Sequence, residues 1–182
     1  MKKSIQPQTS YAPIPSVLVT SGNMEKSNIL TVAWTGIINS EPPLLYISVR
    51  QTRYSYNLIK ENMEFVVNLP NEKLVWETDL CGTKSGKEVD KFKEAKLTKE
   101  VSKIVKTPSI KECPINIECK VKEIKSLGSH DMFIAEIVNI NADEELIDNG
   151  KINLAKANLL GYFGNEYYIA NKKVGDRGIC LK

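Results

Sequence analysis

Three short apolar runs between residues 28 and 70 limit what this chain can fold into more than any other part of the sequence. The runs are rich in β-branched and aromatic residues, which favour strands. Pro42 and Pro43 break the backbone between the first run and the second. We therefore predict three separate strands, over residues 29–35, 44–50 and 65–69.

A short helix is predicted between the second and third of these strands. Tyr54, Leu58, Ile59 and Met63 recur there at helical spacing, which places the start of the helix close to Ser55. The first turn of a helix presents unpaired N–H groups and a partial positive charge. An anion is therefore favoured at this position.

The start of the predicted helix is also rich in cationic and hydroxyl side chains. Arg50, Thr52, Arg53 and Ser55 all lie there, and together with the helix N–H groups they could bind a phosphate. In the alternative interpretation, Thr52 or Ser55 only caps the helix and the arginines are solvated. The pattern by itself leaves both interpretations open.

The rest of the chain indicates a β-barrel with helices on its flanks. Residues 16–20 are predicted to pair with the strand at 29–35, and the alternating residues 115–124 are predicted to turn back into a strand over 132–140. Short helices are expected over residues 72–79 and 89–95. Strands at short spacing with interspersed helices predict a mainly β fold with some α+β character.

One domain is expected from a chain of 182 residues. Residues 1–15 contain three prolines and are predicted to be an extended N-terminal arm, followed by a single domain over residues 16–182. The net charge of +3 is small and dispersed, which argues against a nucleic-acid partner. Residues 84–106 carry eight lysines and four acids, and we interpret them as a solvated surface segment rather than a polyanion site.

Cysteine usage and hydropathy exclude further classes of protein. The four cysteines form no C-x-x-C pair and only one histidine accompanies them, so no metal site is expected. A disulfide framework is not expected in a domain of this size. No apolar stretch approaches the length needed to cross a bilayer, and prolines interrupt the N-terminus where a signal peptide would need an apolar run. We expect no membrane partner and a reducing, cytoplasmic compartment.

Two motifs carry a resemblance to a known family. The first begins as NxxTVAWTG at residue 28 and continues through PP and SVRQTRYSYNLI to EFVVN, and the second is CG-x-x-SG-x-x-x-DKF over residues 81–92. From about residue 16 to residue 168, the chain resembles the flavin reductase-like, FMN-binding split-barrel family, and most of all its flavoredoxin branch. The resemblance implies a split β-barrel of the Greek-key type with short flanking helices. It also implies bound FMN and a homodimer with each flavin at the subunit interface.

A flavin mononucleotide needs cations and amides for its phosphate, polar contacts for its pyrimidine edge and flat apolar surface for its rings. Arg50, Arg53, Ser55 and Lys91 could serve the phosphate end, the backbone around residues 31–35 the pyrimidine edge, and two aromatic side chains the rings. The family resemblance carries over Asn28, Trp34, Ser55, Lys91, His130 and Phe163; Ser55 stands where the family more often has threonine. The candidate cofactor-binding residues are thus Asn28, Thr31, Ala33, Trp34, Thr35, Arg50, Arg53, Ser55, Lys91, His130 and Phe163.

Each of these assignments has a structural alternative. Trp34 and Phe163 are also what a hydrophobic core would contain, and His130 beside an aspartate could be a surface turn residue. Cys81 could be a reactive thiol, although a small buried cysteine is the commoner case. His130 is the only histidine and no G-x-S-x-G motif accompanies it, so a hydrolase triad is not supported.

Two functions from different classes remain. The first is an oxidoreductase that passes electrons from NAD(P)H through bound FMN to an acceptor, for which no catalytic base is required and no catalytic residue is assigned. Because the chain lacks G-x-G-x-x-G, the nicotinamide donor would have to stack on the flavin transiently. The second is a flavoredoxin-type carrier that exchanges electrons with redox proteins and has no NAD(P)H activity of its own. A nucleic-acid-binding barrel would need exposed aromatic and basic residues interleaved on one sheet face, and the strands show little of this.

Overall fold

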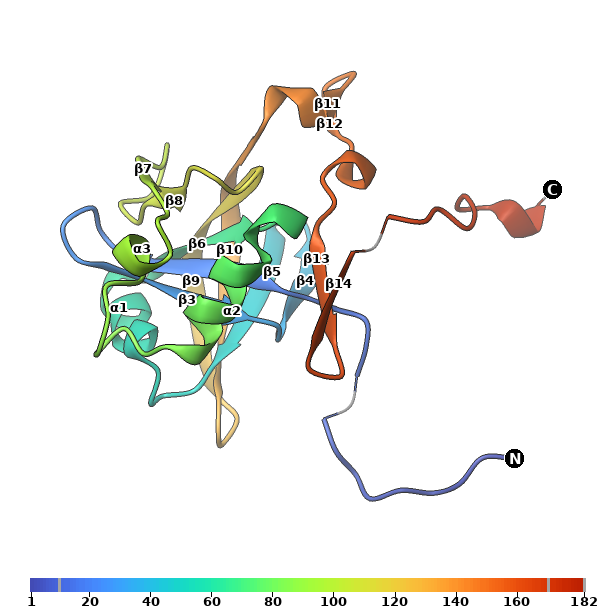
Figure 1. Cartoon of the computed structure of the whole chain (residues 1–182), viewed down its shortest axis with the longest axis horizontal. Coiled ribbons are helices and arrows are strands. Elements are labelled where there is room, and N and C mark those ends of the chain that lie inside the picture. Colours follow the sequence, from blue (N-terminus) through green and yellow to red (C-terminus); the bar gives the residue numbers. More distant parts are fainter. Residues whose placement is uncertain (10, 170, 182) are drawn as a thin grey trace.

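A seven-stranded antiparallel sheet forms the body of the molecule (Figure 1). The structure, a computed structural model, describes residues 1–9, 11–169 and 171–181; Ser10 of the predicted arm and Ala170 and Lys182 of the predicted domain lie outside these ranges. The strand order is β3-β2-β6-β9-β10-β5-β4. The strands are β2 (Val17–Gly22), β3 (Ser27–Val32), β4 (Thr35–Ser40), β5 (Pro43–Val49), β6 (Glu64–Leu69), β9 (Ile115–Ser126) and β10 (Asp131–Ala142).

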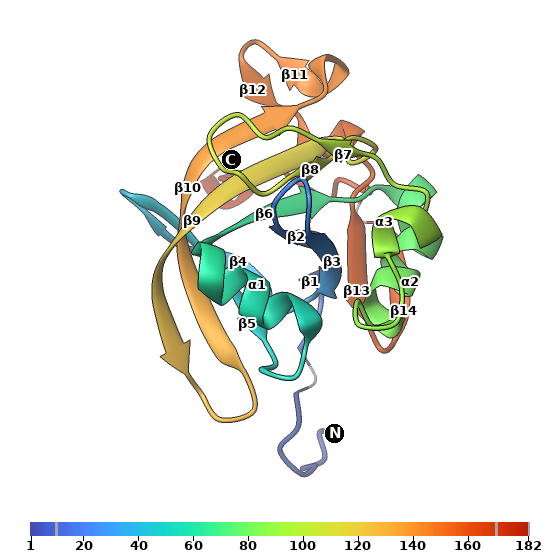
Figure 2. The same ribbon diagram turned by 90° about the vertical axis from the view of Figure 1, so that its left-hand side faces the viewer.

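The sheet curls around its core and stays open. Register shifts between β9 and β10 mark bulges, which increase local twist, and Figure 2 shows α1 (Tyr54–Asn62) lying across the open side. In the part of the chain that the structure describes, β3 and β4 are the sheet edges, so the barrel is not closed by a hydrogen-bonded ladder. The prediction of a mainly β fold with flanking helices is confirmed.

The core draws together two strands that are not neighbours in the sheet. Alternate side chains of β3, Leu30 and Val32, pack in one buried cluster with Ile47 and Val49 of β5 and with Ile59 of α1. Five such buried aliphatic side chains contribute about 1.5–3 kcal/mol each. This packing brings the end of β3, the end of β5 and the start of α1 side by side.

A second apolar cluster covers the outer face of β2 and β3. Leu18 and Ile29 point away from the first core because side chains alternate along a strand, and they pack against Leu80 and Phe92 of two helices. The elements of this layer are η1 (Glu72–Leu74), α2 (Val75–Thr83), α3 (Lys91–Glu94), β7 (Lys99–Glu100) and β8 (Ser109–Ile110).

The C-terminal hairpin forms a separate three-stranded sheet with the end of the N-terminal arm. Its order is β1-β13-β14, and Ile14 pairs with Tyr162. Ile14 and Pro15, at the end of the arm predicted over residues 1–15, form the short strand β1. The remaining elements are β13 (Leu160–Phe163), β14 (Glu166–Ile169), β11 (Ile147–Asp148), β12 (Lys151–Ile152), η2 (Glu144–Leu146), η3 (Leu154–Lys156) and η4 (Ile179–Leu181).

Most predicted elements are present, with two corrections. The strand predicted over residues 29–35 is two strands, because the chain leaves β3 after Val32 and enters β4 at Thr35. The helix predicted over residues 72–79 is η1 followed by α2, which continues to Thr83, whose hydroxyl donates to the Asp79 carbonyl within the last turn.

The four cysteines are free thiols, and the described residues contain neither a metal-binding cluster nor a membrane-spanning helix. Cys81, Cys113 and Cys119 are buried free thiols, and Cys180 is exposed. Within residues 1–9, 11–169 and 171–181, no three His, Cys, Asp or Glu side chains gather as a metal site would require. Over the same ranges, no helix is both long and apolar enough to span a bilayer.

Candidate functional site

A continuous cleft lies where the ends of β3 and β5 meet the start of α1. It consists of two adjoining hollows of about 150 and 160 Å³, which we call the cationic hollow and the central hollow. They share Leu30, Arg50 and Arg53, so one elongated ligand could occupy both. The cationic hollow is lined by Asn28, Leu30, Arg50, Thr52, Arg53, Tyr54, Lys84, Ser85, Gly86 and Lys91. The central hollow is lined by Leu30, Thr31, Val32, Ala33, Trp34, Ser48, Val49, Arg50, Arg53 and His130.

The start of α1 opens into the cationic hollow without a side-chain cap. The N-cap residue is Arg53, in an extended conformation, and it makes no capping hydrogen bond. The part of the alternative interpretation in which Thr52 or Ser55 caps the helix is therefore wrong, whereas Arg50 and Arg53 are exposed, as that interpretation expected. The first N–H groups of the helix and the two arginines point to an anion at this end.

Ser55 faces the interior and orients Asn28. The side chain of Ser55 is fully buried, and its Oγ accepts hydrogen bonds from Asn28 Nδ2 at 2.8 Å and from Ser21 Oγ at 3.0 Å. Ser55 does not line the cationic hollow, whereas Asn28 does. The hydroxyl predicted as a ligand thus acts in this structure through Asn28.

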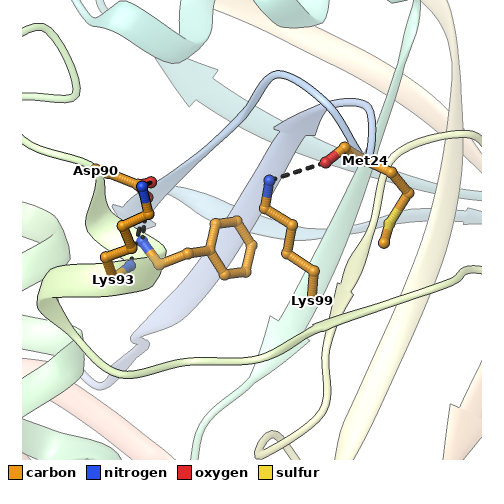
Figure 3. Close-up of polar contacts among 5 residues, drawn as sticks. Met24, Asp90, Lys93 and Lys99 are labelled. Atoms are coloured by element: carbon orange, nitrogen blue, oxygen red, sulfur yellow. Dashed lines mark hydrogen bonds and ion pairs between the residues drawn. The ribbon is translucent and has the colours of Figure 1, made fainter.

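The loop between α2 and α3 packs very closely against Asn28 and Tyr54 at the cationic hollow. A Cβ built on Gly86 would lie 2.3 Å from Asn28 Oδ1 and 2.7 Å from Tyr54 Cδ1, so only glycine allows this approach. The loop ends at Asp90, whose Oδ1 accepts from the backbone N–H groups of Phe92 and Lys93; Figure 3 shows Asp90 beside Lys93. This cap sets the start of α3.

Lys91, the first residue of α3, is turned inward. Its Nζ donates to the carbonyls of Ile29 at 2.8 Å and Cys81 at 2.6 Å, and the side chain is almost fully buried. Burial lowers the pKa of Lys91 to about 8, the nearby Cys81 thiol raises it, and Arg53 lowers it further. An ammonium has three N–H donors, so the two carbonyls leave one for a ligand.

Contacts on the exposed side of α3 hold this helix against the neighbouring elements. Lys93 Nζ lies 3.4 Å from Asp90, and Lys99 Nζ donates to the Met24 carbonyl at 3.0 Å (Figure 3). The Lys99 ammonium also lies 5.2 Å from the centre of the Phe92 ring. These contacts tie α3 and β7 to the β2–β3 turn.

Cys81 does not fit the hypothesis of a reactive thiol. It is fully buried, and burial raises its pKa to about 11, with Lys91 lowering it and Glu77 raising it. A thiol with this pKa is protonated near neutral pH, so it packs as a small apolar side chain.

Trp34 and His130 form one wall of the central hollow. Their ring centres lie 4.6 Å apart, and Ser129 Oγ is 2.9 Å from His130 Nδ1. Burial lowers the pKa of His130, and Arg50 and then Arg53 lower it further. The imidazole is thus neutral at pH 7, with its Nε2 left for a ligand.

Asp131 anchors the turn that carries Arg50 and Arg53, and the sequence alone did not point to this role. Its Oδ2 accepts from the Tyr56 hydroxyl at 2.6 Å and its Oδ1 from Gln51 Nε2 at 3.1 Å. The Tyr56 bond, then the Gln51 bond, lowers the pKa of Asp131. Gln51 lies between Arg50 and Arg53, so this carboxylate fixes the turn that carries both.

Besides Ser55, two candidate residues are not brought into these hollows. Thr35 lies in β4, where its Oγ1 donates to the Tyr46 carbonyl at 2.6 Å. Phe163 lies in β13 and stacks on Tyr168, with ring centres 3.7 Å apart. Phe163 and Trp34 both line a separate hollow of about 640 Å³ near the N-terminal arm. The other predicted residues, apart from Ser55, line the cleft.

The donor set of the cleft matches a ligand with an anionic tail and a planar head. One end offers Arg50, Arg53, Lys84, the α1 N–H groups and one N–H of Lys91, while the other offers the backbone of residues 31–34 beside two ring side chains. Lys84 and Ser85 also line the cationic hollow, but the sequence did not single them out as candidates. Both lie within the second motif, which could have pointed to them.

A family model described as flavin reductase like domain matches residues 9–170. A protein of Archaeoglobus fulgidus is 38% identical over 136 residues, which cover 75% of this chain and 76% of that protein. Among solved structures, flavoredoxin of Desulfovibrio vulgaris (Miyazaki F) is 30% identical with a TM-score of 0.92, and flavoredoxin from Methanosarcina acetivorans is 29% identical with a TM-score of 0.90; each match covers 100% of both chains.

Proposed function

Since the chain belongs to the flavin reductase-like domain family, we propose that it is an FMN-binding oxidoreductase that passes electrons from NAD(P)H through the flavin to an acceptor. The resemblance drawn from its two motifs is confirmed by the match over residues 9–170. The observation that carries the proposal is the continuous cleft, cationic at one end and lined by Trp34 and His130 at the other.

The residues present fit FMN at its phosphate end. Arg50, Arg53 and Lys84 are free to form charge-assisted hydrogen bonds of about 1.5–3 kcal/mol each, and the uncapped start of α1 adds N–H donors. Asn28, fixed by Ser55, could meet the ribityl chain. Thr31 and Ala33, which line the central hollow, offer backbone groups for the pyrimidine edge.

The chemistry asks little of the protein beyond binding and orientation. FMN, when bound, supplies the acceptor for a hydride and the store of two electrons. Trp34 and His130 line the central hollow with their ring centres 4.6 Å apart, and His130 can donate or accept a hydrogen bond through Nε2. By holding the hydride donor and the flavin in a productive relative orientation, the protein would accelerate hydride transfer.

A homodimer with the flavin at its interface completes the proposal. Ile37 and Ile38 lie on the edge strand β4 and are 69% and 45% exposed, and Trp34 beside them is 39% exposed. Exposed apolar side chains on an unpaired strand edge favour association with another chain. A second copy covering β4 would also cover the central hollow beside Trp34.

The second candidate is a flavoredoxin-type electron carrier. The observation that favours it is the similarity to two flavoredoxins over the full length of each chain. An anaerobic titration of the FMN-loaded protein separates the two functions: bleaching of the flavin by NADH or NADPH supports the oxidoreductase. Bleaching only by a reduced redox protein supports the carrier and refutes the proposal.

A further inference from the structure

A third hollow adjoins the central hollow on the side away from the cationic one. We call it the tyrosine hollow; its volume is about 240 Å³, and it is lined by Ser16, Thr31, Ala33, Asp79, Gly82, Thr83, Tyr162 and Tyr167. It shares Thr31 and Ala33 with the central hollow and no lining residue with the cationic hollow. It therefore lies next to the place proposed for the flavin rings, between α2 and the β13–β14 hairpin.

Asp79 of α2 is an exposed residue that lines this hollow and is hydrogen-bonded to the hairpin. The Tyr167 hydroxyl donates to Asp79 Oδ1 at 3.1 Å, and the rings of Tyr162 and Tyr167 lie 5.4 Å apart. Burial and then the Asp79 hydrogen bond raise the pKa of Tyr167 to about 12, which keeps the phenol protonated as a donor. A carboxylate has about four lone-pair sites, so Asp79 retains acceptor capacity for a ligand.

Three other hydroxyls around the hollow, those of Thr31, Thr83 and Tyr162, have already used their hydrogens. Thr31 Oγ1 donates to the Thr78 carbonyl at 2.5 Å, Thr83 Oγ1 to the Asp79 carbonyl at 3.0 Å, and the Tyr162 hydroxyl to Asn165 Oδ1 at 3.1 Å. Their oxygens remain as acceptors. None of the described residues lining the hollow is positively charged.

This lining selects a ligand by its chemistry. Acceptors dominate, so the ligand must bring hydrogen-bond donors, and a phosphate group is disfavoured beside Asp79 in the absence of a cation. A vicinal diol donates two O–H groups to one carboxylate, as aspartate does for ribose in dinucleotide sites. An uncharged group with ribose hydroxyls or a carboxamide fits these requirements.

We propose that the tyrosine hollow binds the nicotinamide–ribose end of the electron donor, with Asp79 accepting hydrogen bonds from the ribose hydroxyls. This inference rests on the proposed NAD(P)H-dependent function. The dihydronicotinamide ring then reaches the flavin site across Thr31 and Ala33, and the charged diphosphate stays outside. Tyr167 is a positioning residue, because it orients the Asp79 carboxylate.

The test compares two hydride donors that differ in the ribose. NADH carries the diol, whereas 1-benzyl-1,4-dihydronicotinamide has the same reactive ring without ribose or phosphate. Flavin reduction in the FMN-loaded full chain is followed anaerobically at increasing concentrations of each donor, with wild type, Asp79→Asn and Tyr167→Phe. Glu94→Gln, which removes an exposed acid of α3 outside all of these hollows, is the matched control.

We expect Asp79→Asn to raise the KM for NADH about tenfold, the loss expected for a charge-assisted hydrogen bond, with a smaller effect on the limiting rate. Tyr167→Phe should raise the same KM less. The benzyl donor should reduce wild type and all variants alike, and FMN affinity should not change. A melting temperature within a few degrees of wild type shows that each variant is folded.

Equal effects of Asp79→Asn on both donors, or no effect on either, would overturn the inference and leave the proposed function standing. Failure of NADH and NADPH to reduce wild-type flavin that the benzyl donor does reduce would refute the NAD(P)H-dependent function, and this inference with it.

Discussion

The buried Lys91 predicts that FMN binding is coupled to a proton. In the empty protein the pKa of Lys91 is about 8, compared with 10.5 for an ordinary lysine, mainly because the side chain is buried. A phosphate dianion in the cationic hollow opposes this effect and moves the pKa of Lys91 back toward its ordinary value. Above pH 8 the empty protein loses the proton while the complex keeps it, so FMN affinity falls as pH rises from 8 toward 10.5.

The size of the effect follows from proton linkage. For a pKa of about 8 without FMN and a complex in which Lys91 stays protonated up to pH 9, the Kd for FMN rises about tenfold between pH 7 and pH 9. The assay is quenching of flavin fluorescence on titration with protein at each pH. Riboflavin is the matched ligand, because it has the same rings and no phosphate. Its Kd should change little over this range.

Lys91→Met tests the assignment of the proton. The variant should bind FMN more weakly at pH 7 and show the shallow pH dependence of riboflavin. It leaves the carbonyls of Ile29 and Cys81 without their donor, which destabilises the fold by about 1–3 kcal/mol for each orphaned group, so binding is measured well below its melting temperature. A steep FMN dependence that persists in Lys91→Met, or that riboflavin shares, would refute the reasoning.

Three further substitutions probe the rest of the cleft. Arg53→Ala should weaken FMN retention about 10- to 100-fold through loss of a charge-assisted contact, whereas Lys93→Ala, on the exposed side of α3, should leave the Kd unchanged; equal values would remove the anion site. Gly86→Ala should release FMN readily, because its Cβ would lie 2.3 Å from Asn28 Oδ1, and an unchanged FMN content after gel filtration would contradict this. Trp34→Ala should alter the absorption spectrum of the bound flavin, and an identical spectrum would place the rings away from the central hollow.

Local sequence patterns sufficed for the elements that carry the site. The helical spacing of Tyr54, Leu58 and Ile59 located α1 within one residue of its observed start, and strand propensity located β5. β4 was missed because the proline pair suggested a break, whereas Pro43 begins β5 in a hairpin with β4. A pattern within one segment does not report which segments pair.

The polar network of the site could not be predicted, because its partners are distant in sequence. The hydrogen bond between Tyr56 and Asp131 joins residues 75 positions apart, and the bond between Asn28 and Ser55 joins residues 27 positions apart. The motif drew attention to Ser55, but only the packing of α1 against β2 and β3 reveals that its hydroxyl oxygen accepts a hydrogen bond from Asn28. Motifs identify residues, and tertiary contacts assign their orientation.

One strand relates the three hollows to the core. Along β3 and the residues that follow it, Leu30 and Val32 point into the curled sheet and pack with α1 and β5, while Thr31 and Ala33 line both the central and the tyrosine hollows. Leu30 in turn lines both the central and the cationic hollows. Residues 30–33 therefore contribute to the core, to the proposed flavin site and to the proposed donor subsite, so a one-residue slip of β3 would disturb the core and the cleft together.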